Sequence, residues 1–127
     1  PEYILDERYI GWAEQNVAES GGSFAISHDI DSAYRGADVV YAKSWGALPY
    51  FGNWAPEKPI RDQYKHFIVD EAKMALTNNG VFSHCLPLRR NVKATDAVMD
   101  SPQCIAIDEA ENRLHVQKAI MAALMQQ

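Results

Sequence analysis

Five of the twelve Lys and Arg residues follow apolar, β-prone segments of this chain, where together they could bind an anion. In open parallel sheets ligands bind outside the carboxyl ends of the strands, so residues that directly follow a strand are the first candidates for chemistry. The segments are residues 38–42, 81–84 and 104–107, and the cations after them are Lys43, Arg89, Arg90, Lys93 and Arg113. The positive end of a helix starting after the third segment would add to them. An anion-binding crevice is expected at these three exits.

Cys85 directly follows the second segment and could act as a nucleophile, since His84 stands next to it. Adjacent residues on a strand point to opposite faces, so the pair could form a Cys–His dyad only across a kink. A role other than covalent catalysis is therefore favoured for Cys85, and no residue is assigned a catalytic role. Cys104, the second of two cysteines, is expected to be a small buried hydrophobic residue.

Each cation also has an explanation that involves no ligand. Lys43 could be a surface lysine, but its position between a buried run and Ser44-Trp45-Gly46 favours binding. Arg113 could instead neutralise Glu109 or Glu111 on its own helix, which would contribute only about 0.2–0.5 kcal/mol.

The other candidates are more evenly balanced. Arg89 and Arg90 fit a solvated turn in which one of them pairs with a carboxylate, and Lys93 suits a solvent-facing position as well as a site. Trp45 and Trp54 could pack the following loop against the domain.

Several other kinds of site are excluded by the residue types. Two Cys and four His lack metal-ligand spacing, so no metal site is expected. No G-x-G-x-x-G or G-x-x-x-x-G-K-[ST] fingerprint of a nucleotide site occurs. A net charge of −5 argues against nucleic-acid binding, because no basic stripe can displace counterions from phosphates.

The composition, 47% hydrophobic and 23% charged over 127 residues, is typical of one soluble globular domain. No apolar run approaches the roughly 20 residues that span a membrane, and the first residues lack the features of a signal peptide. A cytoplasmic protein without a membrane or nucleic-acid partner is expected, and the chain could be a piece of something larger.

The elements that must position these residues alternate along the chain. Strands are predicted at residues 24–27, 38–42, 81–84 and 104–107, the second buried on both faces. Helices are predicted at residues 6–20, 30–34, 61–67, 70–78, 96–100 and 108–125. The first ends at Gly21-Gly22, and Asp29, Asp70 and Asp108 are the expected caps of the second, fourth and sixth. Residues 43–60, with three Pro and two Gly, are expected to form a long surface loop. The order predicts an α/β fold with a three-layer, mostly parallel, doubly wound (Rossmann-like) sheet.

Three motifs at their spacing resemble the second half of the ornithine carbamoyltransferases. They are His84-Cys85-Leu86-Pro87, then Ala94-Thr95-Asp96 with Val98, and finally Glu109-Ala110-Glu111-Asn112-Arg113 with Lys118. The resemblance runs over residues 1–127 and implies the amino-acid-binding domain of a carbamoyltransferase. It implies that backbone carbonyls of Cys85 and Leu86 hold the carbamoyl amide, and that Arg113 helps to bind carbamoyl phosphate.

The chain departs from that family after residues 38–42. Ornithine carbamoyltransferases usually carry Asp-x-x-x-Ser-Met-Gly there, and the Asp receives the substrate's α-ammonium. Aligned on Ser44, the Asp position falls on Val40. A site that loses a carboxylate and gains Lys43 should reject a free α-ammonium and prefer an acylated amine, whose carboxylate Lys43 binds. This pattern resembles the N-acetylornithine and N-succinylornithine carbamoyltransferases, in which the lysine matching Lys93 can be carboxylated.

The resemblance implies carbamoyl transfer from carbamoyl phosphate to the δ-amine of N-acetylornithine, giving N-acetylcitrulline and phosphate in arginine biosynthesis, with no cofactor. Lys43 and Leu86 would bind acetylornithine; Cys85, Leu86 and Arg113 would bind carbamoyl phosphate. The family's Ser-x-Arg-Thr and His-Pro-x-Gln motifs are absent from this sequence, so the chain alone is expected to be inactive, and the full-length protein to be a homotrimer. N-succinylornithine or ornithine as acceptor, a non-catalytic binding domain of the same fold, and half of a nucleotide-dependent oxidoreductase remain the alternatives.

Overall fold

The computed structural model describes residues 3–43 and 46–126, which form two compact units. Residues 3–29 and 46–64 make the first unit, and residues 30–43 and 65–126 make the second. In the described part of the chain, no helix is both long and apolar enough to cross a lipid bilayer.

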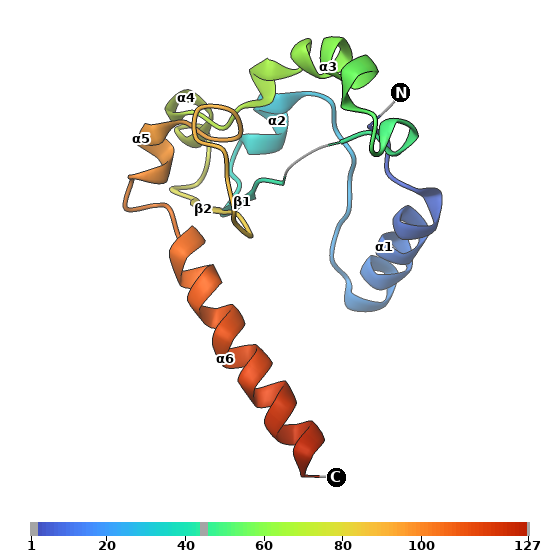
Figure 1. Cartoon of the computed structure of the whole chain (residues 1–127), viewed down its shortest axis with the longest axis vertical. Helices are drawn as coiled ribbons and strands as arrows, with labels where there is room; N and C mark the ends of the chain where they lie inside the picture. The colour runs from blue at the N-terminus through green and yellow to red at the C-terminus, as the bar shows by residue number, and fades with distance from the viewer. Residues whose placement is uncertain (1–2, 44–45, 127) are drawn as a thin grey trace. The chain divides into compact units, whose positions relative to one another are not determined.

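The second unit is built on parallel strands. β1 (Val39–Tyr41) pairs with β2 (Val81–Ser83) in parallel, with Val39 opposite Val81 and Tyr41 opposite Ser83. On the other side of β2, Phe82 forms an isolated parallel bridge with Cys104. The predicted α/β class with parallel pairing is confirmed, and both strand carboxyl ends lie at one edge (Figure 1).

Helices follow or precede these strands, but the helix predicted at residues 61–67 is in this unit a 3-10 turn, and the one predicted at residues 70–78 ends at Met74. They are α2 (Ile30–Tyr34), η2 (Lys65–Phe67), α4 (Glu71–Met74), α5 (Asp96–Met99) and α6 (Ala106–Met125). The Asp70 carboxylate caps α4 by accepting a hydrogen bond from the Lys73 amide at 2.9 Å, as predicted. The Thr95 hydroxyl does the same for α5, accepting from the Val98 amide at 3.2 Å.

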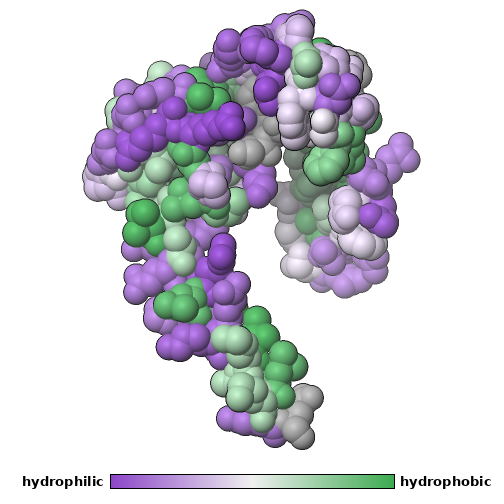
Figure 2. Space-filling view, in the orientation of Figure 1, coloured by the Kyte–Doolittle hydropathy of each residue, from purple (hydrophilic) through white to green (hydrophobic). Residues whose placement is uncertain are grey.

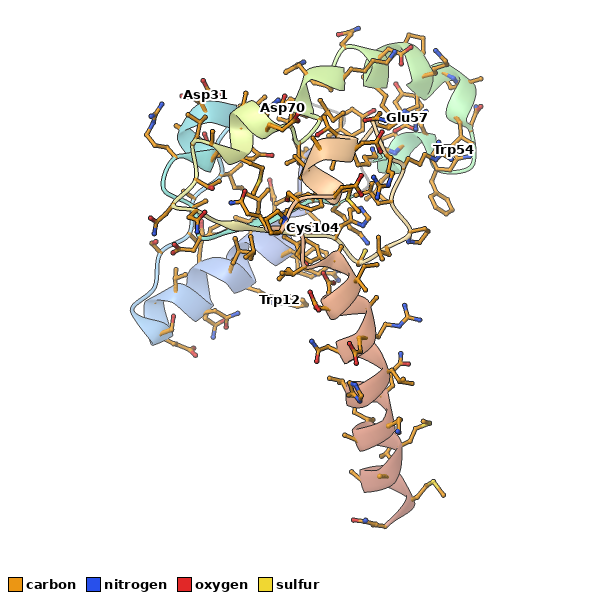
Figure 3. The ribbon with its side chains drawn as sticks, turned by 90° about the vertical axis from the view of Figure 1, so that its left-hand side faces the viewer. Trp12, Asp31, Trp54, Glu57, Asp70 and Cys104 are labelled. Carbon is orange, nitrogen blue, oxygen red and sulfur yellow. The ribbon has the colours of Figure 1, made fainter. Side chains whose placement is uncertain are left out.

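The core of this unit surrounds the fully buried ring of Phe82. Buried side chains of Val69, Met74, Ala94 and Val98 complete it. Cys104 is half-buried against this cluster, next to the bridge that joins it to β2 (Figure 3). It therefore packs as a small hydrophobic residue, although less deeply than expected.

Two strand predictions in the sheet require correction. The segment 104–107 forms only a bridge, because α6 already begins at Ala106. The predicted Asp108 cap is wrong for the same reason: the N-cap position is Ile105, which makes no side-chain capping bond. Burial of β1 on both faces is also wrong, since Val39 and Tyr41 are 58% and 54% exposed.

The first unit contains α1 (Glu7–Ser20), η1 (Leu48–Tyr50) and α3 (Trp54–Asp62). The Asp6 carboxylate caps α1, and Gly21 ends it with a φ of 72°, as the glycine pair predicted. The predicted strand at residues 24–27 is wrong, since these residues have no regular structure. This four-residue segment lies between Gly21-Gly22 and a polar turn, and no described strand of this unit pairs with it.

The predicted loop at residues 43–60 is wrong in its second half, where α3 forms. Pro56 lies in the first turn, where backbone N–H groups have no intrahelical partner to lose. Pro59 lies inside the helix, which continues for three residues beyond it. The fully buried Glu57 supports this arrangement, because its Oε1 accepts hydrogen bonds from the Ala47 amide at 2.9 Å and the Tyr3 hydroxyl at 3.2 Å.

Candidate functional site

Side chains from three elements meet at the carboxyl edge of the two strands. Tyr41 ends β1 and Lys43 follows it, Ser83 ends β2 and Cys85 follows it, and Glu109 lies in the first turn of α6. Because side chains two residues apart on a strand share a face, each strand presents a pair to the same side. We call these five residues the exit cluster.

The centre of the exit cluster is the contact between Lys43 and Cys85. The Lys43 ammonium donates a hydrogen bond to the Cys85 sulfur at 3.1 Å. This bond, followed by one from the Tyr41 hydroxyl, lowers the pKa of the Cys85 thiol, because both donors stabilise the thiolate. The structure thus brings together two of the residues predicted to bind substrates.

Glu109 holds the other side of the cluster. Its Oε1 accepts a hydrogen bond from the Tyr41 hydroxyl at 3.2 Å, and its Oε2 accepts one from the Ser83 hydroxyl. The pKa of Tyr41 rises to about 12, because its hydroxyl is hydrogen-bonded to Cys85, partly desolvated, and hydrogen-bonded to Glu109. Tyr41 therefore stays protonated and remains a donor throughout the physiological range.

His84 points away from this cluster and supports the turn from within. It is 1% exposed, and its Nδ1 accepts a hydrogen bond from the Leu86 amide at 3.0 Å. Burial, then the positive charge of Lys43, lowers the pKa of His84, so the imidazole is neutral with its hydrogen on Nε2. Among the described residues, Nε2 has no hydrogen-bond partner.

This geometry disfavours a Cys–His dyad. The Nδ1 atom of His84 accepts a hydrogen bond from the Leu86 amide, and the Cys85 sulfur accepts one from Lys43. Leu86 itself has a φ of 38°, in the left-handed region that turns the chain sharply. Within the described residues, no hydrogen bond is accepted by the backbone carbonyls of Cys85 or Leu86. These carbonyls remain available to an amide or amine donor.

Of the remaining predicted cations, the three arginines form no side-chain hydrogen bond or ion pair with the exit cluster among the residues that the structure describes. Arg113 is exposed on α6, one turn after Glu109, and no ion pair joins it to Glu109 or Glu111 in the described structure. Glu111 lies instead 3.5 Å from the His115 imidazole. Arg113 is thus not brought into the exit cluster, although it lies on the same helix.

Lys93 is half-buried near the turn. Its amide donates to the Arg89 carbonyl at 3.0 Å, which closes the turn after β2. Its charge helps to lower the pKa of His84, after the larger effects of burial and Lys43. The charge of Lys93 therefore acts on the buried imidazole of His84, which supports the turn beside the site.

Arg90 has the structural role proposed for one of the two arginines. Its guanidinium donates to Asp96 at 2.9 Å and to Asp100 at 2.6 Å, which ties the turn to α5.

Two tryptophans were predicted to pack the loop after β1 against the domain. Trp54 packs edge-on against Phe51, with ring centroids 6.3 Å apart. Trp45 lies outside the described residues, as does Ser44.

Val40 does not fit the proposed loss of a site carboxylate. It lies inside β1 and packs against the apolar core. A carboxylate here would be desolvated among hydrophobic side chains and could not serve the strand exit. The charge that distinguishes this exit is therefore Lys43.

Tyr41, Ser83 and Glu109 were not predicted as site residues, because the candidates were the cations and the His84–Pro87 segment that follow the strands. The two-residue period of a strand would have paired Tyr41 with Lys43 and Ser83 with Cys85. Glu109 had a weaker signal, as one of two acidic residues in the first turn of a helix.

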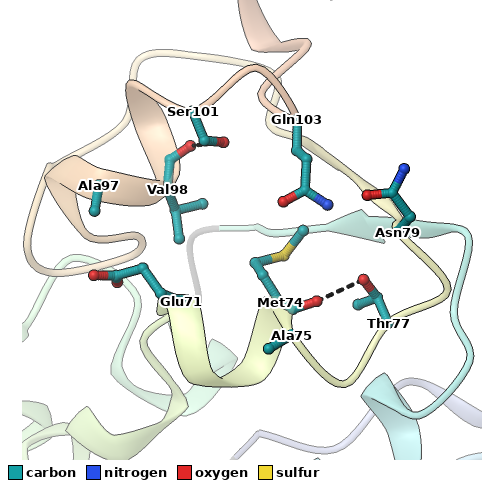
Figure 4. Close-up of a pocket in the computed structure, with 9 residues that line it drawn as sticks. All are labelled: Glu71, Met74, Ala75, Thr77, Asn79, Ala97, Val98, Ser101 and Gln103. Carbon is teal, nitrogen blue, oxygen red and sulfur yellow. Dashed lines mark hydrogen bonds between the residues drawn. The ribbon is translucent and has the colours of Figure 1, made fainter.

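A separate cavity of about 340 Å³ lies between α4 and α5 (Figure 4). Met74 and Val98 form its apolar wall, and Glu71, Asn79, Ser101 and Gln103 supply polar atoms. The lining residues include a carboxylate and no Lys or Arg, so this cavity suits an anionic ligand poorly. The exit cluster remains the candidate site.

Comparison with known proteins finds a family model that matches most of the chain. The family model described as "Aspartate/ornithine carbamoyltransferase, Asp/Orn binding domain" matches residues 1–124. The N-acetylornithine carbamoyltransferases of Xanthomonas campestris pv. campestris and Xylella fastidiosa (strain 9a5c) are 88% and 82% identical over 127 residues. An ornithine carbamoyltransferase of Pyrococcus abyssi is 46% identical over 125 residues. The chain spans 38% of the length of each of these relatives.

Solved structures agree with the sequence comparison. A crystal structure of acetylornithine transcarbamylase complexed with acetylcitrulline matches with a TM-score of 0.90 and 90% identity. A mutant of N-acetyl-L-ornithine transcarbamylase complexed with carbamyl phosphate and N-succinyl-L-norvaline matches with the same values. Each match covers 98% of this chain and 37% of the other.

Proposed function

Because this chain belongs to the aspartate/ornithine carbamoyltransferase family, as its Asp/Orn-binding domain, we propose that it acts in an N-acetylornithine carbamoyltransferase of arginine biosynthesis. Residues 1–127 would be the amino-acid-binding domain, and the carbamoyl-phosphate domain would come from sequence beyond this chain. The 38% coverage of relatives supports this division. The acetylcitrulline complex of a relative at 90% identity supports the acylated product.

The reaction joins two bound substrates without a covalent enzyme intermediate. The neutral δ-amine of N-acetylornithine attacks the carbamoyl carbon, the new C–N bond forms, and the bond from that carbon to the phosphate oxygen breaks. The amine loses a proton, and inorganic phosphate leaves with the electron pair. Holding both substrates in contact lowers the barrier, and so do positive charges and donors near the developing oxyanion and the departing phosphate.

The observation that carries this proposal is Lys43 at the strand exit, 3.1 Å from Cys85. An exposed ammonium here can bind the α-carboxylate of the acceptor but repels a free α-ammonium. Acylation removes that ammonium, so N-acetylornithine suits the site better than ornithine does. The free carbonyls of Cys85 and Leu86 would receive the N–H groups of the reacting amide and amine.

Two further roles rest on the family pattern. Arg113 would bind carbamoyl phosphate, and its exposure on α6 leaves it free for a ligand or a neighbouring domain. Lys93 would be the lysine that becomes carboxylated. Intact mass of the complete protein tests this, since a carboxylated Lys93 loses one carbon dioxide on acidification and a Lys93→Arg variant does not.

The complete protein would be a cytoplasmic homotrimer. The isolated chain should give no product, since residues of the other domain must grip the phosphate. Sedimentation of the complete protein tests the trimer, and a dimer or monomer that is fully active would contradict it.

The function is tested by incubating the complete protein with carbamoyl phosphate and N-acetylornithine. N-Acetylcitrulline and equimolar phosphate are expected, with product identified by mass spectrometry. A Lys43→Gln variant should lose binding of N-acetylornithine while still binding carbamoyl phosphate in calorimetry. Absence of any carbamoylated product from the folded complete protein would overturn the proposal.

A further inference from the structure

Lys43 and Cys85 form a close pair of an amine and a thiol. The Lys43 Nζ atom donates a hydrogen bond to the Cys85 sulfur at 3.1 Å. Among the described residues no carboxylate forms an ion pair with Lys43. The carboxylate of the exit cluster, Glu109, accepts its hydrogen bonds from Tyr41 and Ser83 instead. The sulfur is therefore the polar partner of this ammonium.

The pair is open to a small oxidant from solvent. Lys43 is exposed and Cys85 is only half-buried. The hydrogen bond from Lys43 also lowers the pKa of the Cys85 thiol, which enlarges the fraction of thiolate at neutral pH. The thiolate is the form of cysteine that reacts with peroxides. The site thus holds an oxidisable sulfur with a primary amine against it.

One equivalent of hydrogen peroxide is enough to join these two groups. The Cys85 thiolate attacks one peroxide oxygen and the O–O bond breaks, so the sulfur loses two electrons, the peroxide gains them, and a sulfenic acid and hydroxide form. The hydroxide takes a proton from the Lys43 ammonium, which gives water and the free amine. The amine attacks the sulfenic sulfur, an S–N bond forms, and the sulfenic hydroxyl leaves as water with a proton from the nitrogen. The ion pair and one peroxide therefore yield a neutral sulfenamide and two water molecules.

We propose that Lys43 and Cys85 form a reversible oxidation site, in which hydrogen peroxide links the two side chains as a sulfenamide. The 3.1 Å contact carries this inference, because an amine held against the sulfur reacts with the sulfenic acid before a second peroxide arrives. The link also removes the positive charge of Lys43 and so stops it from binding the acceptor's carboxylate. This last consequence rests on the proposed function, whereas the link itself does not.

The test is mass spectrometry of the complete protein after treatment with hydrogen peroxide and digestion with trypsin. We expect one linked species that contains Lys43 and Cys85, lacks two hydrogen atoms relative to the separate peptides, and is not cleaved after Lys43. Dithiothreitol should return it to the two unmodified peptides, since a thiol cleaves the S–N bond. Protein treated in urea should give no linked species, because 42 residues separate the pair in the sequence.

Lys43→Arg is the matched variant. The guanidinium keeps a positive charge beside the sulfur but stays protonated, so it does not attack the sulfenic acid. Cys85 should then oxidise further to the sulfinic acid, which dithiothreitol does not reverse. Cys104 is the internal control, since it packs against the apolar core and should form no link to a lysine.

Three results would overturn the proposal. They are oxidation of Cys85 in the wild type without a linked species, a linked species that retains a peroxide oxygen, and links from Cys104 or from other lysines in equal yield. Each would show that the contact with Lys43 does not direct the oxidation.

Activity gives a second readout in the same samples. Carbamoylation of N-acetylornithine should fall in proportion to the linked fraction and return with dithiothreitol. Full activity of the linked protein would contradict the role of Lys43 in binding the acceptor. Failure of the proposed function is recognised separately, because the untreated protein would then carbamoylate no ornithine derivative while the linked species still formed.

Discussion

The Lys43 ammonium lies 3.1 Å from the Cys85 sulfur, although 42 residues separate them in the sequence. The parallel pairing of β1 and β2 creates this contact, since each residue lies two positions beyond the last paired residue of its strand. A cation and a thiol thereby share one edge of the sheet, where acceptor and carbamoyl group would meet.

Removal of the Lys43 charge should make Cys85 less reactive. Lys43 lowers the pKa of Cys85, so the thiolate forms at lower pH than in an ordinary cysteine. In Lys43→Gln the pKa returns toward its usual range, and alkylation at pH 7 should slow about tenfold. Lys43→Arg keeps the charge and serves as the control. Identical pH profiles for wild type and Lys43→Gln would contradict the contact.

His84 should stabilise the turn only while its imidazole is neutral. Its Nδ1 atom accepts the Leu86 amide bond, and a proton there would break that bond. Burial lowers the pKa of His84, so this stability is fully present above about pH 6.5 and is lost as pH falls through the lowered folded value. Urea unfolding at several pH values measures it.

Two variants separate the hydrogen bond from the bulk of the ring. His84→Ala should cost about 2–4 kcal/mol at pH 7.5, from the cavity together with the unpaired Leu86 amide. His84→Asn retains an acceptor near Nδ1 and should cost less, with weaker pH dependence between 5 and 7. An alanine variant as stable as wild type would show that the turn does not depend on His84.

Gly80 should be intolerant of a side chain. A Cβ at this position would lie 2.6 Å from the Ala37 carbonyl oxygen and 3.0 Å from that of Asp38. Both are backbone atoms at the start of β1 and cannot move without disturbing the pairing with β2. Gly80→Ala should therefore destabilise the protein by about 1–3 kcal/mol in thermal or urea unfolding. Gly11→Ala is the control, since nothing lies within 4 Å of its Cβ position. Equal midpoints for the two variants would contradict close approach at Gly80.

The strands and caps that the sequence predicted correctly depend on local patterns. The apolar, β-prone pair Val81-Phe82 favours a strand by its residue types, and Asp70 caps α4 through its own neighbours. The predictions failed where contacts between residues far apart in the sequence determine the secondary structure. Glu57 is fully buried and binds the Ala47 amide, which stabilises α3 in a segment rich in Pro. Tertiary contacts of this kind leave no local signal.

Part of the site was also predictable from local patterns in the sequence. The positions of Lys43 and Cys85 after two parallel strands predict that they share one edge of the sheet, and strand alternation argues against a Cys–His dyad. The direction of Glu109 toward Tyr41 depends on where α6 begins, and it begins two residues earlier than the apparent cap at Asp108 indicated. A shift of two residues rotates a helix by more than half a turn.

The α6 helix presents exposed apolar side chains. Leu114, Ile120 and Leu124 are 57%, 54% and 65% exposed (Figure 2). Apolar patches of this kind favour association.

The central claim is that Lys43 selects an acylated acceptor, and the ratio of kcat/KM for N-acetylornithine to that for ornithine tests it most directly. It is measured in the complete protein with saturating carbamoyl phosphate. Repulsion and desolvation of a free α-ammonium beside Lys43 predict a preference of about 100-fold or more for N-acetylornithine. Equal values for the two acceptors, or a preference for ornithine, would contradict the account.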